Sequence, residues 1–409
     1  MNALGSHYAA LRRPEAGHRR GAGLRVERSE MAVEIREFTD ADEEWAAGVW
    51  SIAFRDGLPL TKEEVEPAFG EEHFVAERDG RPVGLFSVHS MTATRDGNAI
   101  PCAGIASVAV PPEERRSGVA EAMMNWCANE LRHRGFAIGS LYAFSEAYYR
   151  KFGWECAGHR VSITCPSSKL PESDDVLPIA RHSYDAWPQA KIVYDAFAKR
   201  YSGMNCRSDE GWDKMRGKSR DRTLLFLAGD PPEAYAMLVL SPWREKQFIS
   251  ECAWTTARGH RSLLALFRAL GVNRDPIEWY EPSDSPFLAS FLDYGVEVSL
   301  TRPVMYRVFD VPKAISYLRP TTSGEFTIRV ADSFAGGTWR VKYDPAGIVV
   351  TQADHAEIRM SLGHFTQALL GEPSLSDLAR QGLAEADPVA LQSAVRLFTP
   401  HPTYCMDFF

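Results

Sequence analysis

The chain has 409 residues, of which 45% are hydrophobic and 24% charged, and its formal net charge is −8. This composition is ordinary for a soluble globular protein of two to three domains, and it argues against collagen, coiled coil and wholesale disorder. No apolar run approaches the ~18 residues that a membrane-spanning helix requires. The acidic balance slightly favours cationic small molecules as partners, and we expect neither nucleic acid nor a membrane.

The cysteines and histidines indicate a reducing compartment and no metal centre. None of the seven cysteines forms a Cys-x-x-Cys pair, so we expect free thiols in a cytoplasmic protein rather than a disulfide framework or a zinc site. The eleven histidines contain no His-Glu-x-x-His spacing. We therefore expect no bound metal.

The first segment, residues 1–31, is predicted to be a flexible extension. It contains several arginines and glycines and lacks the apolar stretch that a signal peptide needs. The alternation of Val33 and Ile35 just after it is typical of a strand. Met31 is therefore a candidate for the biological start.

Two helices and a run of antiparallel strands are predicted next. Residues 40–54 and 62–68 have helical patterns, and the first of these follows a plausible N-terminal cap. Alternating apolar runs then surround the Asp-Gly pairs at 79–80 and 96–97. Because Asp-Gly favours the tight turns of β-hairpins, we expect a hairpin at each pair.

A strand over residues 104–110 leads into the most informative part of the sequence. The proline pair at 111–112 ends the strand, because proline cannot donate to the sheet ladder. Residues 119–134 carry apolar side chains at spacings of three and four, as an amphipathic helix does. A turn rich in arginine and glycine, at 115–118, connects the two elements.

This strand, turn and helix form a cradle for an anion. The first amides of a helix have no partners and carry partial positive charge. Gly118 lets a phosphate approach the backbone, while Arg115 and Arg116 add charge. The pattern Arg-x-x-Gly-x-Ala at this place resembles the pyrophosphate-binding motif of the GNAT acetyltransferases, which bind coenzyme A; the alternative is an ordinary solvated helix start.

The resemblance implies acetyl-CoA as co-substrate and a free strand edge that pairs with its pantetheine arm. The residues that it implies for binding acetyl-CoA are Ser107, Val108, Ala109, Val110, Arg115, Arg116, Ser117, Gly118, Val119, Ala120 and Ser145. A Tyr-x-x-Phe-Gly-Trp run resembles the family's segment in which a tyrosine acts as an acid, and its first residue is Tyr149. The alternative role for Tyr149 is core packing. Residues 161–165 are predicted to be the strand that closes this domain.

Residues 166–305 repeat the order of elements without repeating the motif. A helical pattern at 183–201, a hairpin at 222–240 and a helix at 261–270 follow the order of the first domain. The segment at 257–262, where the cradle should be, lacks the Arg-x-x-Gly-x-Ala spacing. We infer a second, degenerate GNAT-like domain that does not bind coenzyme A; the alternative is an unrelated α+β domain.

The remaining residues, 306–409, predict an antiparallel sheet covered by helices. Four alternating strands between 326 and 361 precede three helical patterns between 363 and 398. This order resembles a sterol-carrier-protein-like α+β domain. The fold class is therefore α/β (α+β), with a catalytic GNAT domain at 32–165 and a degenerate one before this tail.

This architecture resembles the enhanced intracellular survival (Eis) family of acetyltransferases over nearly the whole chain. The resemblance implies acetylation of amines, including aminoglycosides, and a hexamer. It also implies that the terminal carboxylate, here that of Phe409, is a base at the active site. Where mycobacterial members have Glu before the last Phe, this chain has Phe408, with Asp407 one step earlier. Trp50, Phe54 and Asp56 lie where the family lines its amine pocket; for Asp56 the alternative is surface solvation.

A mechanism follows from the chemistry of acyl transfer. An alkyl ammonium with a pKa of ~10.4 must lose a proton before it attacks, and the Phe409 carboxylate is the candidate base, through water. The amide of Val108 would stabilise the developing oxyanion, and Tyr149 would protonate the leaving sulfur. The competing reading is a non-catalytic GNAT scaffold whose C-terminal domain binds a lipid or another apolar ligand.

Overall fold

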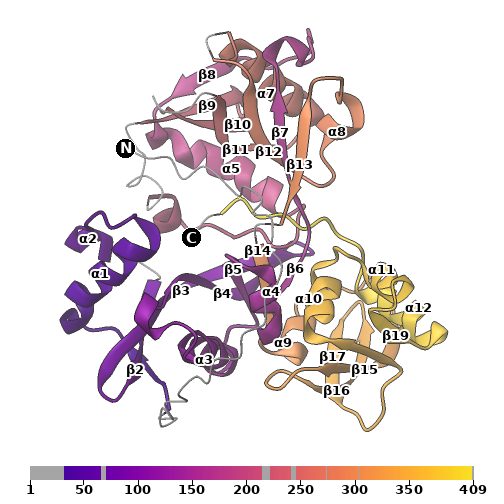
Figure 1. The fold of residues 1–409 in the computed structure, drawn as a ribbon. Helices are drawn as coiled ribbons and strands as arrows, with labels where there is room; N and C mark the ends of the chain where they lie inside the picture. The colour runs from indigo at the N-terminus through magenta and orange to yellow at the C-terminus, as the bar shows by residue number, and fades with distance from the viewer. Residues whose placement is uncertain are drawn as a thin grey trace, which may run out of the picture.

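The computed structural model describes residues 32–65, 71–213, 222–240, 246–272, 274–302 and 304–407. The predicted extension at 1–31 and the terminal Phe408 and Phe409 lie outside the described residues. Three sheets organise the described chain, each covered by its own helices (Figure 1). The expected mixed α/β class with a third, C-terminal sheet is confirmed.

The first sheet holds seven strands in the order β1-β2-β3-β4-β5-β14-β6. Helices α1 (Glu43–Phe54) and α2 (Lys62–Val65) pack beside Leu85, whereas α3 (Val119–His133) packs beside Phe86. Since successive strand residues point to opposite faces, these helices cover opposite sides of the sheet. The strands are β1 (Glu34–Glu37), β2 (Glu71–Arg78), β3 (Arg81–Arg95), β4 (Asn98–Ala109), β5 (Ile138–Tyr142), β6 (Glu155–Cys156) and β14 (Val304–Val308).

Both predicted hairpins are confirmed. Asp79 and Gly80 have φ angles of 54° and 71°, and Asp96 and Gly97 have 49° and 73°. Two successive positive φ angles define the type I′ turn, whose twist matches that of the strands that it joins. The long pair β3–β4 that results forms the centre of the sheet and leads the chain directly to the cradle.

The second sheet has the order β13-β7-β12-β11-β10-β9-β8, with helices α5 (Trp187–Ala198), α7 (Ala257–Leu270) and α8 (Pro286–Ser290). Its strands are β7 (Arg160–Cys165), β8 (Ile179–His182), β9 (Thr223–Gly229), β10 (Pro232–Val239), β11 (Gln247–Trp254), β12 (Ile277–Pro282) and β13 (Glu297–Thr301).

One strand lies in a different sheet from the predicted one. Residues 161–165 were expected to close the first domain, but β7 pairs with β12 and β13 of the second sheet. Strand β14 instead pairs antiparallel with β5 and β6 in the first sheet. The alternating apolar residues Val161, Ile163 and Cys165 are buried in the second core, which explains this placement. The two halves of the chain are thus interleaved.

The third sheet has the order β17-β16-β15-β18-β19 and forms a core with the helices that follow it. Its strands are β15 (Gly324–Ala331), β16 (Gly337–Asp344), β17 (Gly347–Gln352), β18 (Ile358–Ser361) and β19 (Ala384–Ala386). Its helices are α9 (Val311–Ile315), α10 (Leu362–Leu370), α11 (Leu375–Arg380) and α12 (Pro388–Leu397).

The segment after α12 leaves the third domain and returns to the other two (Figure 1). Thr403 forms a parallel bridge with Ser202, and Tyr404 is buried in the core of the second domain. Cys405 packs beside Tyr306 of β14. The end of the chain therefore approaches the first sheet at the border of β5 and β14.

Candidate functional site

A bulge in β4 opens the first sheet. Leu85 pairs with Ala109 and Ser87 with Ala106, so two residues of β4, Ser107 and Val108, lie opposite a single residue of β3. Ser107 has a φ of 51°, which is rare for a residue with a side chain. Bulges of this kind bend a strand and increase its twist.

The strand beyond the bulge has a free edge. β4 and β5 pair only from Cys102 to Ile105, and no register follows beyond that point in the described chain. The backbone at 107–110 therefore faces a gap that an extended ligand can enter by pairing as a strand does. Val108 and Val110 pack against the same apolar cluster as Tyr149.

The turn between β4 and α3 has the geometry of an anion cradle. Arg116 and Gly118 both adopt left-handed backbone, with φ of 63° and 86°. Gly118 stands immediately before Val119, the first residue of α3, and a Cβ at Gly118 would meet no atom within 4 Å. Among the described residues, no acceptor bonds the amides of Val119 and Ala120. The amides are thus open to an anion.

Two arginines contact this turn: Arg115 is exposed to solvent, whereas Arg78 holds the turn in place. Arg115 donates from Nε to the carbonyl of Val110 at 3.2 Å and remains exposed. Arg78, at the end of β2, donates from Nη2 to the carbonyl of Ser117 at 2.8 Å and pairs with Glu114 at 3.2 Å. Arg78 therefore braces the turn from outside. The sequence analysis missed it, because its partners are 36 and 39 residues away.

Tyr149 lies where a protonated hydroxyl is favoured. Its side chain is 3% exposed and packs edge-on against Phe144 and Tyr148. Burial, followed by the neighbouring Tyr148 and Cys127, raises the pKa of Tyr149 well above its usual 10. Its hydroxyl makes no hydrogen bond within the part of the chain that the structure describes.

Ser145 holds the backbone of Tyr149 in place through its carbonyl group. It stands at the N-terminus of α4 (Glu146–Tyr149), and its carbonyl accepts from the amides of Tyr148 and Tyr149 at 3.1 and 3.3 Å. Its side chain makes no capping hydrogen bond. The residue as a whole is half-buried.

The three predicted acceptor residues lie in two different environments. Trp50 is 5% exposed, and its Nε1 donates to the carbonyl of Ser107 at 2.9 Å, which supports the bulge. Phe54 is 47% exposed, and Asp56 lies in the exposed turn after α1 with a φ of 51°. Trp50 thus contacts the bulge of β4, whereas Phe54 and Asp56 face outward.

A cavity of about 260 Å³ lies between α1 and the segment that leads into the cradle. None of the three predicted acceptor residues lines it. The lining residues come from one face of α1 and from the proline turn: Glu44, Trp45, Gly48, Val49, Ile52, Ala53, Val110, Pro111, Pro112, Glu113 and Arg115.

The last described residue is fixed by a buried ion-pair network. Asp407 accepts from Nε of Arg207 at 2.6 Å and from the hydroxyl of Tyr194 at 2.9 Å. Arg207 also forms a bidentate pair with Glu251 at 2.9 and 2.7 Å. Burial alone would lower the pKa of Arg207, but the carboxylates of Asp407 and Glu251 outweigh it and raise that pKa well above its usual value.

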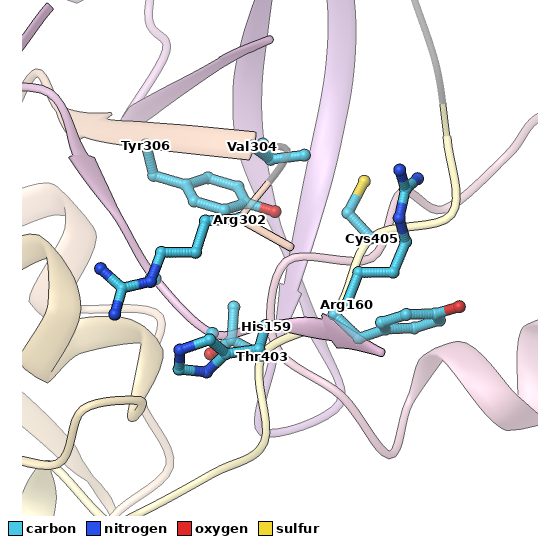
Figure 2. Close-up of a pocket in the computed structure, with 10 residues that line it drawn as sticks. His159, Arg160, Arg302, Val304, Tyr306, Thr403 and Cys405 are labelled. Carbon is cyan, nitrogen blue, oxygen red and sulfur yellow. The ribbon is translucent and has the colours of Figure 1, made fainter. Parts of the chain in front are cut away.

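The same segment contacts the first sheet. The hydroxyl of Tyr142, at the end of β5, donates to the carbonyl of Asp407. A gap of about 10 Å³ remains under the segment, between Tyr306 of β14 and Cys405 (Figure 2). That volume holds about one water molecule, so it is a packing gap and not a ligand site. Phe409, the predicted base, follows two residues later, outside the described residues.

The equivalent turn of the second domain is closed. Thr256 caps α7 and accepts from the amide of Gly259 at 3.0 Å, so one of the helix's first amides is already occupied. A Cβ at Gly259 would lie 2.9 Å from the carbonyl of Glu233, so the β9–β10 hairpin covers this turn. Arg258 and Arg261 pair with Asp175 instead of facing an anion.

The other expectations about composition can be checked within the described ranges. There, no group of three or more His, Cys, Asp or Glu side chains is placed to hold a metal ion. All seven cysteines are free thiols, and Cys206 is the exposed one. No helix of the described chain has the length and apolarity to cross a membrane.

Two family descriptions match separate parts of the chain. Residues 34–157 match the acetyltransferase (GNAT) domain, and residues 311–406 match the sterol carrier protein domain. An uncharacterised N-acetyltransferase of Streptomyces avermitilis is 24% identical over 78% of this chain and 84% of its own length. One from Streptomyces coelicolor is 25% identical over 88% of this chain and 97% of its own.

Solved structures show the same fold over most of the chain. A GCN5-related N-acetyltransferase from Anabaena variabilis superposes with a TM-score of 0.82 at 18% identity, covering 92% of this chain and 100% of that one. Eis1 from Mycobacterium abscessus gives a TM-score of 0.75 at 21% identity, with the same coverage. Residues 34–157 are therefore a GNAT acetyltransferase domain and residues 311–406 a sterol carrier protein domain, and the chain as a whole shares the fold of these structures, Eis1 included.

Proposed function

We propose that the chain transfers the acetyl group of acetyl-CoA to a primary amine by direct attack through a tetrahedral intermediate. The observation that carries the proposal is the bulged, free edge of β4, which leads into a cradle with open amides. The pantetheine arm would pair with residues 107–110, and the pyrophosphate would accept from the amides at 118–120 with Arg115 and Arg116 nearby.

The proton transfers are assigned to two groups. The amine nitrogen attacks the thioester carbon while its proton passes, through water, to the terminal carboxylate of Phe409. The amide of Val108 stabilises the oxyanion. When the C–S bond breaks, Tyr149 gives its proton to the thiolate, and its raised pKa keeps that proton available across the working pH range.

The placement of Asp407 supports the assignment of Phe409. Asp407 is bound to Tyr142 at the open end of β5, and two more residues extend at most ~7 Å. The remaining aspects follow from the family resemblance: an aminoglycoside, polyamine or lysine-type acceptor, a hexameric assembly and a cytoplasmic location. The division into three domains with limits near 165 and 305 belongs to the same proposal, with strands β7 and β14 exchanged between the first two sheets.

A panel of primary amines tests this function, with release of free thiol from acetyl-CoA as the readout. We expect turnover with at least one cationic amine and none without an acceptor. Thiol release that needs no amine, or no release with any member of the panel, would contradict the proposal.

A second candidate is a binding protein for apolar ligands, favoured by the sterol carrier match at 311–406. A thermal-shift comparison separates the two functions. Stabilisation by acetyl-CoA and not by a fatty acid supports the enzyme, because only a ligand bound by the folded state raises the melting temperature.

A further inference from the structure

A carboxylate and two imidazoles lie together on the α1 face of the first sheet, on strands β2 and β3. Ser87 and His89 follow Leu85 at intervals of two residues, so they point to the face that α1 covers. On β2, His73 lies directly opposite Ser87, and Glu71 lies directly opposite His89. All four side chains therefore share this face.

The Glu71 carboxylate is oriented by its neighbours. Its Oε1 lies 3.3 Å from Nε2 of His89 and 3.9 Å from Nδ1 of His73. The side chains of Glu71 and His89 are each 13% exposed. The carboxylate is thus held in place and yet accessible to a ligand.

Hydrogen bonds hold the second imidazole in place. Nε2 of His73 lies 3.1 Å from the carbonyl of Val65, which only accepts, so this nitrogen carries a hydrogen. Nδ1 lies within hydrogen-bond distance of the Ser87 hydroxyl, at 2.9 Å. Of the two imidazoles, that of His89 therefore lies nearer to the Glu71 carboxylate.

Contacts link this group to the reacting centre. The ring of His73 packs against Trp50 with 5.0 Å between centroids. The indole of Trp50 donates to the carbonyl of Ser107 in the bulge. Opposite His89 on β4 stands Gly104, which adds no side chain to this face. Glu71 is thus connected through packed side chains to β4, the strand that is proposed to bind acetyl-CoA.

We propose that Glu71, oriented by His89, binds a second cationic group of the acceptor while the first, neutral amine attacks at the bulge. Two interstrand spacings and about three residues separate Glu71 from Val108, and these combine at right angles to roughly 14 Å between the two Cα atoms. The acceptor class is therefore a long diamine or oligoamine with that spacing. This inference rests on the proposed amine acetylation.

The test compares two amines that differ only in their second charge, 1,8-diaminooctane and octylamine, on the full chain at saturating acetyl-CoA. We expect wild type to favour the diamine in kcat/KM, and Glu71→Gln to lower that preference roughly tenfold or more through KM. The kcat/KM for octylamine should stay the same.

Glu72→Gln is the matched control. Glu72 is the next residue along β2, points to the opposite face and pairs with exposed Arg134. This change should leave the preference for the diamine intact. An equal loss of preference in both variants would show that Glu71 has no specific role.

A third amine keeps the proposal testable even if Glu71→Gln folds poorly. 1,4-Diaminobutane is too short to reach Glu71 from the bulge, so wild type should not favour it over butylamine. Acetylation of octylamine without any preference for the long diamine would overturn the role of Glu71 alone. Failure to acetylate any of these amines would overturn the proposed function as well.

Discussion

The burial of Tyr149 suits the role of general acid that we propose for it. A buried phenol keeps its proton, and the side chain makes no hydrogen bond within the described chain that would compete with a leaving sulfur. Tyr149→Phe keeps the ring and removes the proton donor. We expect kcat to fall ~100-fold, as for loss of a general acid, while the Kd for acetyl-CoA holds.

The direction of the tyrosine's pKa shift makes this prediction sharper. The neutral form is the acid, and the pKa lies above 10, so Tyr149 stays competent at every pH below that value. A loss of kcat between pH 8 and pH 10 would therefore have to come from another group. Wild-type kcat across this range, compared with that of Tyr149→Phe, checks the assignment.

At the scale of elements, the turn between β4 and α3 is built for close approach of an anion. Gly118 has left-handed backbone, and open space surrounds the position of its missing side chain. Gly118→Glu should strain the backbone and place a negative charge in the cradle, weakening coenzyme A binding by several kcal/mol. Arg115→Ala should cost about 1.5–3 kcal/mol. Calorimetric titration measures both; unchanged affinity in both variants would contradict the cradle.

The contribution of Arg78 to the turn can be tested by comparing it with Arg81. Arg78 holds the carbonyl of Ser117 and the carboxylate of Glu114, whereas Arg81 is exposed three residues later, across the hairpin turn. Arg78→Met should weaken coenzyme A about tenfold, because one charged hydrogen bond stabilises the turn by roughly 1.5 kcal/mol or more. Arg81→Met should have no effect. Equal affinities for the two variants would assign Arg78 a purely peripheral role.

The elements could be predicted largely from the sequence, because their signals are local. The Asp-Gly turns, the glycine before α3 and the helical spacing of Met123 and Cys127 all act within a few residues. The exchange of β7 for β14 could not be predicted, since both segments alternate alike and only the packed cores decide between them. The same distinction between local and long-range signals applies to the candidate site residues. Gly118 lies in a local motif, whereas Arg78 and the proposed contact residue Glu71 are brought near the candidate site only by the pairing of distant strands.

At the scale of the whole molecule, the described part of the second domain presents no open cradle like that of the first domain. Its turn is closed by Thr256 and by the hairpin that contains Glu233, and its arginines pair with Asp175. Calorimetric titration should therefore give one coenzyme A per chain. A stoichiometry of two would contradict the hypothesis that the second domain does not bind coenzyme A. Gly118→Glu should bring the stoichiometry close to zero, which shows that the single site is the one in the first domain.

The second domain has another role, since it holds the end of the chain. Arg207 joins Glu251 of β11 to Asp407, and all three side chains are nearly buried. Removing one partner of such a buried network costs about 3–5 kcal/mol, because it leaves charge without compensation. We therefore expect the second domain, which lacks an open cradle in its described part, to serve as the anchor for the end of the chain.

This arrangement predicts how changes at the chain end affect turnover. Asp407→Asn keeps the shape of the side chain and weakens the bond to Arg207. If the Phe409 carboxylate is the base, kcat should fall about tenfold while acetyl-CoA binding holds, because the base then loses its anchor. A C-terminal histidine tag moves that carboxylate away and should abolish turnover, whereas the same tag before residue 1 should not. The deciding comparison is kcat for the two tagged forms at equal folded fraction. Full activity with the C-terminal tag would remove Phe409 from the mechanism, and the anchor at Asp407 would then serve stability alone.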